Sequence, residues 1–243
     1  MNAINWQTSA AKYAVLDIET GNAPAEFIEK ALNDWKPPSN VKDHEKIESR
    51  RRDAMDKIME RGALLDASPI LCVCIQTDRC STVFNGMDLG PNEIIGWTVI
   101  DHSNEVSMLR SLRVWMDMNI DFDTDISGHN IRAFDLPKLR NAYVRNRLQL
   151  PQCLIPRENQ NITDTAKLFK FFSMQHRDDF CPSLDDMADS LGLARHKQIV
   201  NGADVHKLHE IGEHKAILTY CCLDVATTTA AYLLMTGQSP ELT

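Results

Sequence analysis

Two acidic residues one position apart, Asp17 and Glu19, are the first pair in the sequence whose types could do chemistry. They follow a short apolar segment, residues 13–16, whose composition predicts a buried strand that ends where the charges begin. Because side chains alternate along a strand, both carboxylates should point to one face. Such pairs are common at strand exits, so this pair indicates a site only in combination with others.

A third carboxylate, Asp135, closes the segment Ser-Gly-His-Asn-Ile-Arg-Ala-Phe-Asp at positions 127–135. We expect this segment to follow a strand and to open a helix. Phe134 can then pack into the core while Asp135 lies in the first helical turn, where the positive end of the helix dipole favours an acid. An ordinary aspartate at a helix start gives the same pattern.

The last helix of the chain supplies Tyr220 and Asp224. Residues four apart in a helix lie on the same face about one turn from each other, so the phenol and the carboxylate should face the same way. Many helices contain this spacing, and it has weight only together with the other acids.

Four carboxylates in one site would repel one another by about 4 kcal/mol per close pair at an effective dielectric of about 20. A cation must offset this repulsion. Oxygen ligands suit hard ions, and Mg²⁺ keeps positions open for water and substrate phosphates. Two such ions, roughly 3.5 to 4 Å apart, stabilise the entering and leaving oxygens of in-line attack at phosphorus. The combination predicts metal-assisted hydrolysis of phosphodiester bonds.

In this combination and order, the motifs resemble those of the DEDD superfamily of 3′→5′ exonucleases, which have an RNase H-like fold. The matching residues are Asp17-x-Glu19, Asn130-x-x-x-Phe134-Asp135 and Tyr220-x-x-x-Asp224. The tyrosine marks the DEDDy form, because the histidine form would carry histidine at the position of Thr219. The sequence is most similar to stand-alone bacterial and phage proteins related to the exonuclease domain of family B DNA polymerases.

The resemblance implies a role for each acidic residue and two bound ions, Mg²⁺ or Mn²⁺. Asp17, Glu19 and Asp224 would hold the metal that binds the attacking water, with Asp17 bridging to the second metal. Asp135 would hold that second ion, and Tyr220 would orient the water.

Substrate binding is implied for Thr20, Asn130 and Phe134. The expected substrate is single-stranded DNA or a DNA 3′ end, shortened with release of nucleoside 5′-monophosphates. Partners would include a polymerase or another replication or repair protein, with proofreading in trans or DNA repair as the process. Two alternatives remain: a 3′→5′ exoribonuclease or oligoribonuclease, and a non-catalytic module that binds nucleic-acid ends or docks on a polymerase.

The elements that must position these residues indicate an α/β fold, a mixed β-sheet flanked by helices. Strands are expected over 69–77 and 81–85, joined as a hairpin, and over 125–128. Helices are expected over 104–119, 136–148 and 213–235. We expect one domain over 1–243, with residues 24–66 forming a charged helical insertion, or arm, within it.

Composition limits the classes of partner. A formal charge of −8 excludes an overall basic coat for binding nucleic acid. The seven cysteines include no C-x-x-C pair, which argues against a disulfide framework or a zinc ribbon and favours the cytoplasm. The longest apolar run is far shorter than the roughly 20 residues of a membrane span, so no membrane partner is expected.

Residues 136–157 form a locally basic segment without acidic residues. Its cations either track a phosphate backbone or form an ordinary solvated helix face; they are Lys138, Arg140, Arg145, Arg147 and Arg157.

Two further candidates are left open. His129 is adjacent to Asn130 and could contact substrate, whereas Cys72 and Cys74 fit small buried hydrophobic residues better than metal ligands.

Overall fold

A six-stranded mixed sheet forms the centre of the computed structural model, which describes residues 10–60, 62, 66–90, 93–174, 181–194 and 202–238. The strand order is β4-β3-β2-β1-β5-β6. The strands are β1 (Tyr13–Thr20), β2 (Ile70–Thr77), β3 (Ser81–Asn85), β4 (Thr98–Asp101), β5 (Asp125–Gly128) and β6 (Ile162–Asp164). β2 is antiparallel to β1 and β3, whereas β5 is parallel to β1 and β6.

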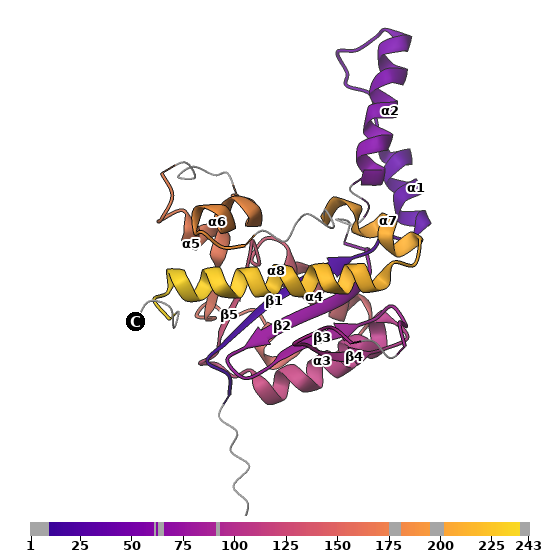
Figure 1. Cartoon of the computed structure of the whole chain (residues 1–243). Helices are drawn as coiled ribbons and strands as arrows, with labels where there is room; N and C mark the ends of the chain where they lie inside the picture. Colours follow the sequence, from indigo (N-terminus) through magenta and orange to yellow (C-terminus); the bar gives the residue numbers. More distant parts are fainter. Residues whose placement is uncertain are drawn as a thin grey trace, which may run out of the picture.

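Helices cover both faces of the sheet, with α8 across one face and α3 and α4 on the other (Figure 1). Their bounds are α3 (Glu105–Asn119), α4 (Asp135–Arg145) and α8 (His214–Met235). Alternate residues of β1 divide between the two cores: Leu16 and Ile18 pack toward α3 and α4, and Val15 packs toward α8. This arrangement confirms the predicted mixed α/β architecture.

Shorter helices complete the rest of the described fold. α5 (Thr165–Phe169) and α6 (Leu184–Ser190) pack against the C-terminal half of α8 through Phe169, Met187 and Ala231. Two 3₁₀ turns, η2 (Gln152–Leu154) and η3 (Gly202–Asp204), and α7 (Val205–Glu210) lie in the connections. Ser183 caps α6, because its hydroxyl accepts a hydrogen bond from the amide of Asp186 at 3.1 Å.

Helix α8 has the length and mean hydropathy of a membrane-spanning helix, the single one with these properties among the described residues. Its most apolar stretch is, however, 61% buried inside the protein. Val225 and Cys221 are fully buried against the sheet. The apolar composition of α8 is accounted for by its place in the core.

Sequence patterns misplaced some elements. β1 does not end before Asp17 but continues to Thr20, so the two acids lie inside the strand. β4 and α7 were not expected at all. β4 has only four residues, none of them fully buried, and therefore lacks the apolar alternation by which strands are recognised. α7 has six residues, of which only Val205 is buried.

Between β1 and β2 the chain forms two helices that stand away from the sheet, α1 (Ala25–Asp34) and α2 (His44–Glu60) (Figure 1). α1 contains no buried residue, and Phe27 is 47% exposed. At the base of this arm, Asn22 donates a hydrogen bond to Glu210 of α7 at 2.9 Å. Residues 50–52, the three consecutive arginines, are exposed. The arm therefore presents mainly polar surface, as its sequence predicts.

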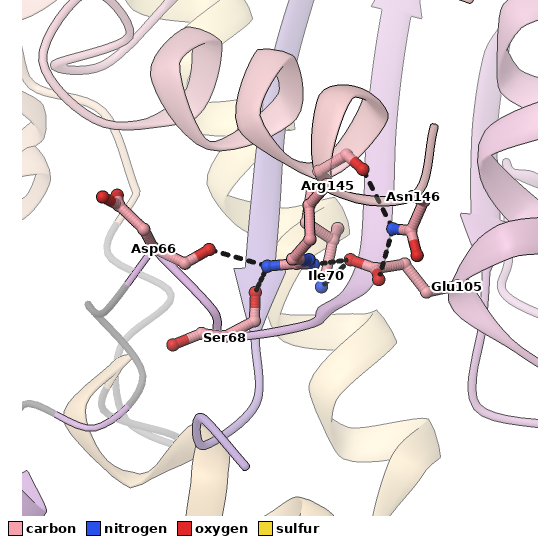
Figure 2. Close-up of polar contacts among 7 residues, drawn as sticks. Asp66, Ser68, Ile70, Glu105, Arg145 and Asn146 are labelled. Atoms are coloured by element: carbon pink, nitrogen blue, oxygen red, sulfur yellow. Dashed lines mark hydrogen bonds and ion pairs between the residues drawn. The ribbon is translucent and has the colours of Figure 1, made fainter. Parts of the chain in front are cut away.

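Arg145, at the end of α4, fixes the segment through which the chain returns from the arm to the sheet (Figure 2). Its guanidinium donates hydrogen bonds to the carbonyl oxygens of Asp66 and Ser68 at 2.6 and 3.1 Å. It also forms an ion pair of 2.6 Å with Glu105, at the start of α3.

The same Glu105 carboxylate accepts two further hydrogen bonds. The amide of Ile70, the first residue of β2, donates to it at 2.8 Å, and the side chain of Asn146 donates at 2.9 Å (Figure 2). One carboxylate and one guanidinium thus connect α3, α4 and the start of β2. This network sets where β2 begins beside β1.

These contacts change the interpretation of the basic segment. Lys138 is 6% exposed, with its ammonium 5.9 Å from the ring centre of Phe134, and burial lowers its pKa to about 8. Arg140 donates to the carbonyl of Leu154 at 2.8 Å. Together with Arg145, these cations make internal contacts, so α4 does not present the continuous basic face that a phosphate track requires.

We expect Arg145→Ala to lower the free energy of unfolding by about 1 to 3 kcal/mol, because it removes a partly buried ion pair and the donor to two backbone carbonyls. Urea unfolding monitored by circular dichroism measures the change. The control is Arg113→Ala, which removes an exposed pair with Asp117 on one turn of α3 and should cost less than about 0.5 kcal/mol. Equal effects for the two variants would contradict a structural role for the network.

Candidate active site

Asp17 and Glu19 project from the middle of the sheet, on the face covered by α8. In β1 they lie opposite Cys74 and Cys72 of β2 respectively. On the other side of β1, pairing with β5 extends only through Val15. The backbone of β1 beyond that residue is therefore available to groups from other parts of the chain.

Asp135 approaches β1 at this point. Its carboxylate accepts a hydrogen bond from the amide of Ile18 at 3.2 Å, so it contacts the peptide that lies between Asp17 and Glu19. Asp135 is the first residue of α4 and is 2% exposed. The structure thus joins the first and second motifs, which are 117 residues apart, by a direct contact.

The turn from β5 to α4 brings Asp135 to β1. At Gly128 an added Cβ would lie 2.7 Å from the carbonyl oxygen of Leu16, so only glycine permits this approach of β5 to β1. Asn130 has a positive φ of 59°, a conformation that asparagine tolerates better than most residues. Its carbonyl accepts the amides of Ala133 and Phe134, which closes the turn before the helix.

Asp164, at the end of β6, holds this turn from the other side. Its carboxylate accepts hydrogen bonds from the backbone amides of Asn130 and Arg132 at 3.1 and 3.3 Å, and it also caps α5. His129 is within hydrogen-bonding distance of Thr165 at 3.2 Å and of the carbonyl of Pro182 at 2.8 Å. Both ring nitrogens of His129 thus face protein groups, and the side chain connects the turn before α4 to the start of α5 and to the residue before the α6 cap.

Helix α8 supplies the third motif. Tyr220 is 8% exposed, and Asp224, one turn further along the helix, lies near enough to raise the pKa of the phenol. Between them, the thiol of Cys221 lies 3.4 Å from a carboxylate oxygen of Asp17. Ligand atoms of Asp17, Glu19 and Cys221 all lie within 4.8 Å of one another. Residues 17–19, 135 and 220–224 therefore meet in one place.

The carboxylates raise one another's pKa. Loss of hydration raises the pKa of Asp17 well above its usual range, and the charges of Asp135 and Asp224 raise it further. Burial and then the charge of Asp17 do the same for Glu19. Burial raises the pKa of Asp135 to about 7, although the amide of Ile18 opposes the change. The folded chain therefore disfavours full ionisation of this cluster.

A divalent cation fits this donor set. Within the described part of the chain, no lysine or arginine forms an ion pair with Asp17, Glu19 or Asp135. Carboxylate oxygens are the ligands that Mg²⁺ and Mn²⁺ prefer, and a bound cation reverses the unfavourable charge of the cluster. The residues present are those that such an ion requires.

The three substrate-binding candidates lie beside the acids but differ in environment. Thr20 is 5% exposed at the end of β1, where the pairing with β2 shifts register. Asn130 is partly buried in the turn before α4. Phe134 is partly buried and packs against the core, as expected, so only part of its surface is available to a ligand.

Some residues that support the site were not found from the sequence. Cys221 and Asp164 had no assigned role, although Cys221 contacts Asp17 and Asp164 accepts the amide of Asn130. Gly202 was also missed: an added Cβ there would lie 3.3 Å from the hydroxyl of Tyr220. Most of the loop before Gly202, residues 195–201, lies outside the described residues.

Comparison with protein families matches residues 101–243 to a family described as "predicted 3′-5′ exonuclease related to the exonuclease domain of PolB". The match covers more than half of the chain, and the chain belongs to this family. No curated protein matches the chain. The mixed sheet flanked by helices is the RNase H-like fold expected of such an exonuclease.

Membership supports exonuclease activity, a nucleic-acid substrate and dependence on a divalent metal. The matched segment contains Asp135, Tyr220 and Asp224 but begins after the first motif. Asp17 and Glu19 are connected to the rest of the site by contacts in the structure, namely those of Ile18 with Asp135 and of Asp17 with Cys221.

The raised pKa of Asp135 leads to a stability prediction for the metal-free protein. The folded chain holds the Asp135 proton up to a pKa of about 7, whereas the ordinary value is 3.8. The contribution of this raised pKa to the free energy of unfolding is fully present below pH 3.8 and is lost as the pH rises through about 7. Asp135→Asn cannot ionise, so the parent should lose stability relative to this variant over that window. Urea unfolding with a chelator tests this, and a constant difference would contradict it.

Gly202→Ala should displace the Tyr220 hydroxyl, because the new methyl group would contact it at 3.3 Å. We expect an exonuclease rate lower by up to about tenfold, the size of effect that a small misplacement can cause. In a Tyr220→Phe background the oxygen is absent, so the same change should have little effect. Equal losses in both backgrounds, measured as a double-mutant cycle, would show that Gly202 acts in another way.

Proposed function

We propose that this protein is a 3′→5′ exodeoxyribonuclease that uses two ions, Mg²⁺ or Mn²⁺, to release nucleoside 5′-monophosphates from DNA 3′ ends. The observation that carries the proposal is the convergence of four acids from three distant segments beside a buried tyrosine. The acids are Asp17, Glu19, Asp135 and Asp224, and the tyrosine is Tyr220. The whole chain, 1–243, would work as one exonuclease domain, with residues 24–66 as its arm.

Each acid has a distinct part in this proposal. Asp17, Glu19 and Asp224 would hold the ion nearest the attacking water, and Asp17 would be shared with the second ion. Asp135 would hold the second ion, and the amide of Ile18 keeps its carboxylate directed at β1. When bound, the two ions would supply a nucleophilic water and stabilise the charge on the entering and leaving oxygens.

Tyr220 is suited to orient the attacking water. Burial raises its pKa, and the charges of Asp224 and Glu19 raise it further. The phenol therefore stays protonated at neutral pH and can donate or accept a hydrogen bond without changing charge. Asp224, one turn along α8, places a carboxylate beside this phenol.

The 3′-terminal nucleotide would lie between the end of β1 and the turn before α4. Thr20 could bind it through its backbone, Asn130 through its side-chain amide, and Phe134 through the exposed part of its ring. The three come from two neighbouring segments next to the acids.

RNA remains the alternative polymer, because the groups that would sense a 2′-hydroxyl are not identified by this arrangement. A non-catalytic end-binding module is disfavoured by the carboxylates themselves. Binding a phosphate backbone without metal ions would bring further negative charge to a cluster that already opposes ionisation. Docking on a polymerase has no support in the comparisons.

The direct test uses 5′-labelled single-stranded DNA, matched RNA and duplex DNA, each with Mg²⁺, with Mn²⁺ and with chelator. Stepwise shortening of the labelled DNA, abolished by the chelator, is the expected outcome. Faster shortening of RNA than of DNA would show that RNA is the preferred substrate. Activity that persists in chelator would contradict metal-dependent catalysis.

Substitutions test the assigned roles. We expect Asp17→Asn and Asp224→Asn each to lower the rate at least about a hundredfold, because each removes a metal ligand. Tyr220→Phe should lower the rate less, on the order of 10-fold to 100-fold, since it removes only the hydroxyl that would orient the attacking water. Rates are measured with excess Mg²⁺ on the single-stranded substrate.

The matched control is Asp53→Asn, which removes an exposed acid of α2 and should leave the rate unchanged. Circular dichroism and thermal unfolding check that every variant is folded. Parent-like rates in both Asp17→Asn and Asp224→Asn would show that the site assignment is wrong.

A further inference from the structure

Four cysteines lie directly behind the carboxylates, two from β2 and two from α8. The sulfur atoms of Cys72, Cys74 and Cys221 all lie within 4.8 Å of one another. The sulfur of Cys222 lies 3.5 Å from that of Cys74. Three of the four residues are fully buried and Cys222 is 2% exposed. We refer to Cys72, Cys74, Cys221 and Cys222 as the thiol cluster.

The register of the sheet places this cluster against the acids. Cys72 lies opposite Glu19, and Cys74 lies opposite Asp17, on the face of the sheet that α8 covers. Cys221 belongs to both groups, since its sulfur contacts Asp17 at 3.4 Å and also lies with the other thiols. Hard oxygen donors and soft sulfur donors are therefore adjacent, and the contact between Cys221 and Asp17 joins the two groups.

Packing alone requires small apolar side chains here, which alanine or valine could supply. Sulfur adds a set of convergent soft donors, the ligands that Zn²⁺ and Cd²⁺ bind in proteins. Tetrahedral Zn²⁺ with bonds of about 2.3 Å needs sulfur atoms about 3.8 Å apart. Separations of up to 4.8 Å reach that geometry with inward shifts of about 1 Å or less.

We propose that Cys72, Cys74 and Cys221 form a second metal site, which binds one thiophilic divalent ion, Zn²⁺ or Cd²⁺. Each thiol gives its proton to water as its sulfur–metal bond forms, and no electron is transferred. The fourth ligand would be Cys222, whose sulfur lies 3.5 Å from that of Cys74, or Asp17, whose carboxylate oxygen lies 3.4 Å from the sulfur of Cys221. Metal-bound Cys221 is a thiolate and no longer donates a hydrogen bond to Asp17, so occupancy of the thiol cluster inhibits the carboxylate site. Only this inhibition rests on the proposed nuclease function.

Cadmium alone is the probe for the site itself. Thiolate coordination of Cd²⁺ produces an ultraviolet charge-transfer absorption that carboxylate coordination does not. The whole metal-free, reduced chain, titrated with Cd²⁺, should develop this absorption and saturate at one ion per chain. Zn²⁺ added afterwards should remove it by competition. Absence of the absorption in the folded parent would overturn the proposal.

Variants within the chain provide matched controls. Cys72→Ala and Cys221→Ala should weaken Cd²⁺ binding by at least about tenfold, because each removes a ligand. Cys80→Ala and Cys153→Ala, which lie outside the thiol cluster, should titrate like the parent. Thermal unfolding verifies that each variant is folded. Parent-like titration of both Cys72→Ala and Cys221→Ala would also overturn the proposal.

The failure of this site and the failure of the nuclease proposal are distinguishable. Asp224→Asn, expected to be inactive, should keep the cadmium absorption, so the thiol site can be present in a chain without activity. In an active parent with excess Mg²⁺, low Zn²⁺ should inhibit the rate, and Cys72→Ala should resist this inhibition relative to its own zinc-free rate. Equal inhibition of parent and variant would place the inhibitory ion at the carboxylates and contradict the proposed coupling.

Discussion

Electrostatic repulsion among four closely placed carboxylates is the constraint on which the rest of this structure depends. The acids do not attract one another, so contacts with the rest of the fold must hold them in place. The amide of Ile18 holds Asp135, the thiol of Cys221 contacts Asp17, and the packing of α8 across the sheet presents Tyr220 and Asp224. These contacts belong to the core of the fold, so the positions of the acids depend on the same packing that holds the sheet and its helices together.

The elements with a strong apolar period could be predicted from the sequence, and those without it could not. The hairpin of β2 and β3 and the helix α8 carry apolar runs, and their bounds were expected within a few residues. β1 was expected to end at Asp17 because charge normally marks the end of a buried strand. It continues because Asp17 and Glu19 face the site, where their burial is set by groups far away in sequence.

The convergence of the acids could also be expected from the sequence, because their types, order and spacing form a pattern, whereas their roles stay a prediction. The residues that support the acids could not be expected, since each acts through a contact between distant segments. Asp164 holds the turn at Asn130 from 34 positions away, and Cys221 reaches Asp17 across 204 positions. For Arg145 the sequence left a phosphate contact and a solvated helix face as alternatives, whereas its partners in the structure are Glu105 and the backbone before β2.

The choice of thiols behind the acids follows from what the acids must do. A lysine or arginine at Cys72 or Cys221 would neutralise Asp17 and Glu19 and compete with a divalent cation for their oxygens. A larger apolar residue would fill the space but offer no hydrogen bond to the oxygen that faces Cys221. A thiol is small, donates only weakly and carries no fixed charge, so it supports the carboxylates and leaves them available to a hard ion. The same polarisable sulfur atoms, once gathered from β2 and α8, are the ligands that soft ions prefer. The arrangement that leaves the acids available to a divalent cation therefore also creates the place where the proposed thiophilic ion would act on them.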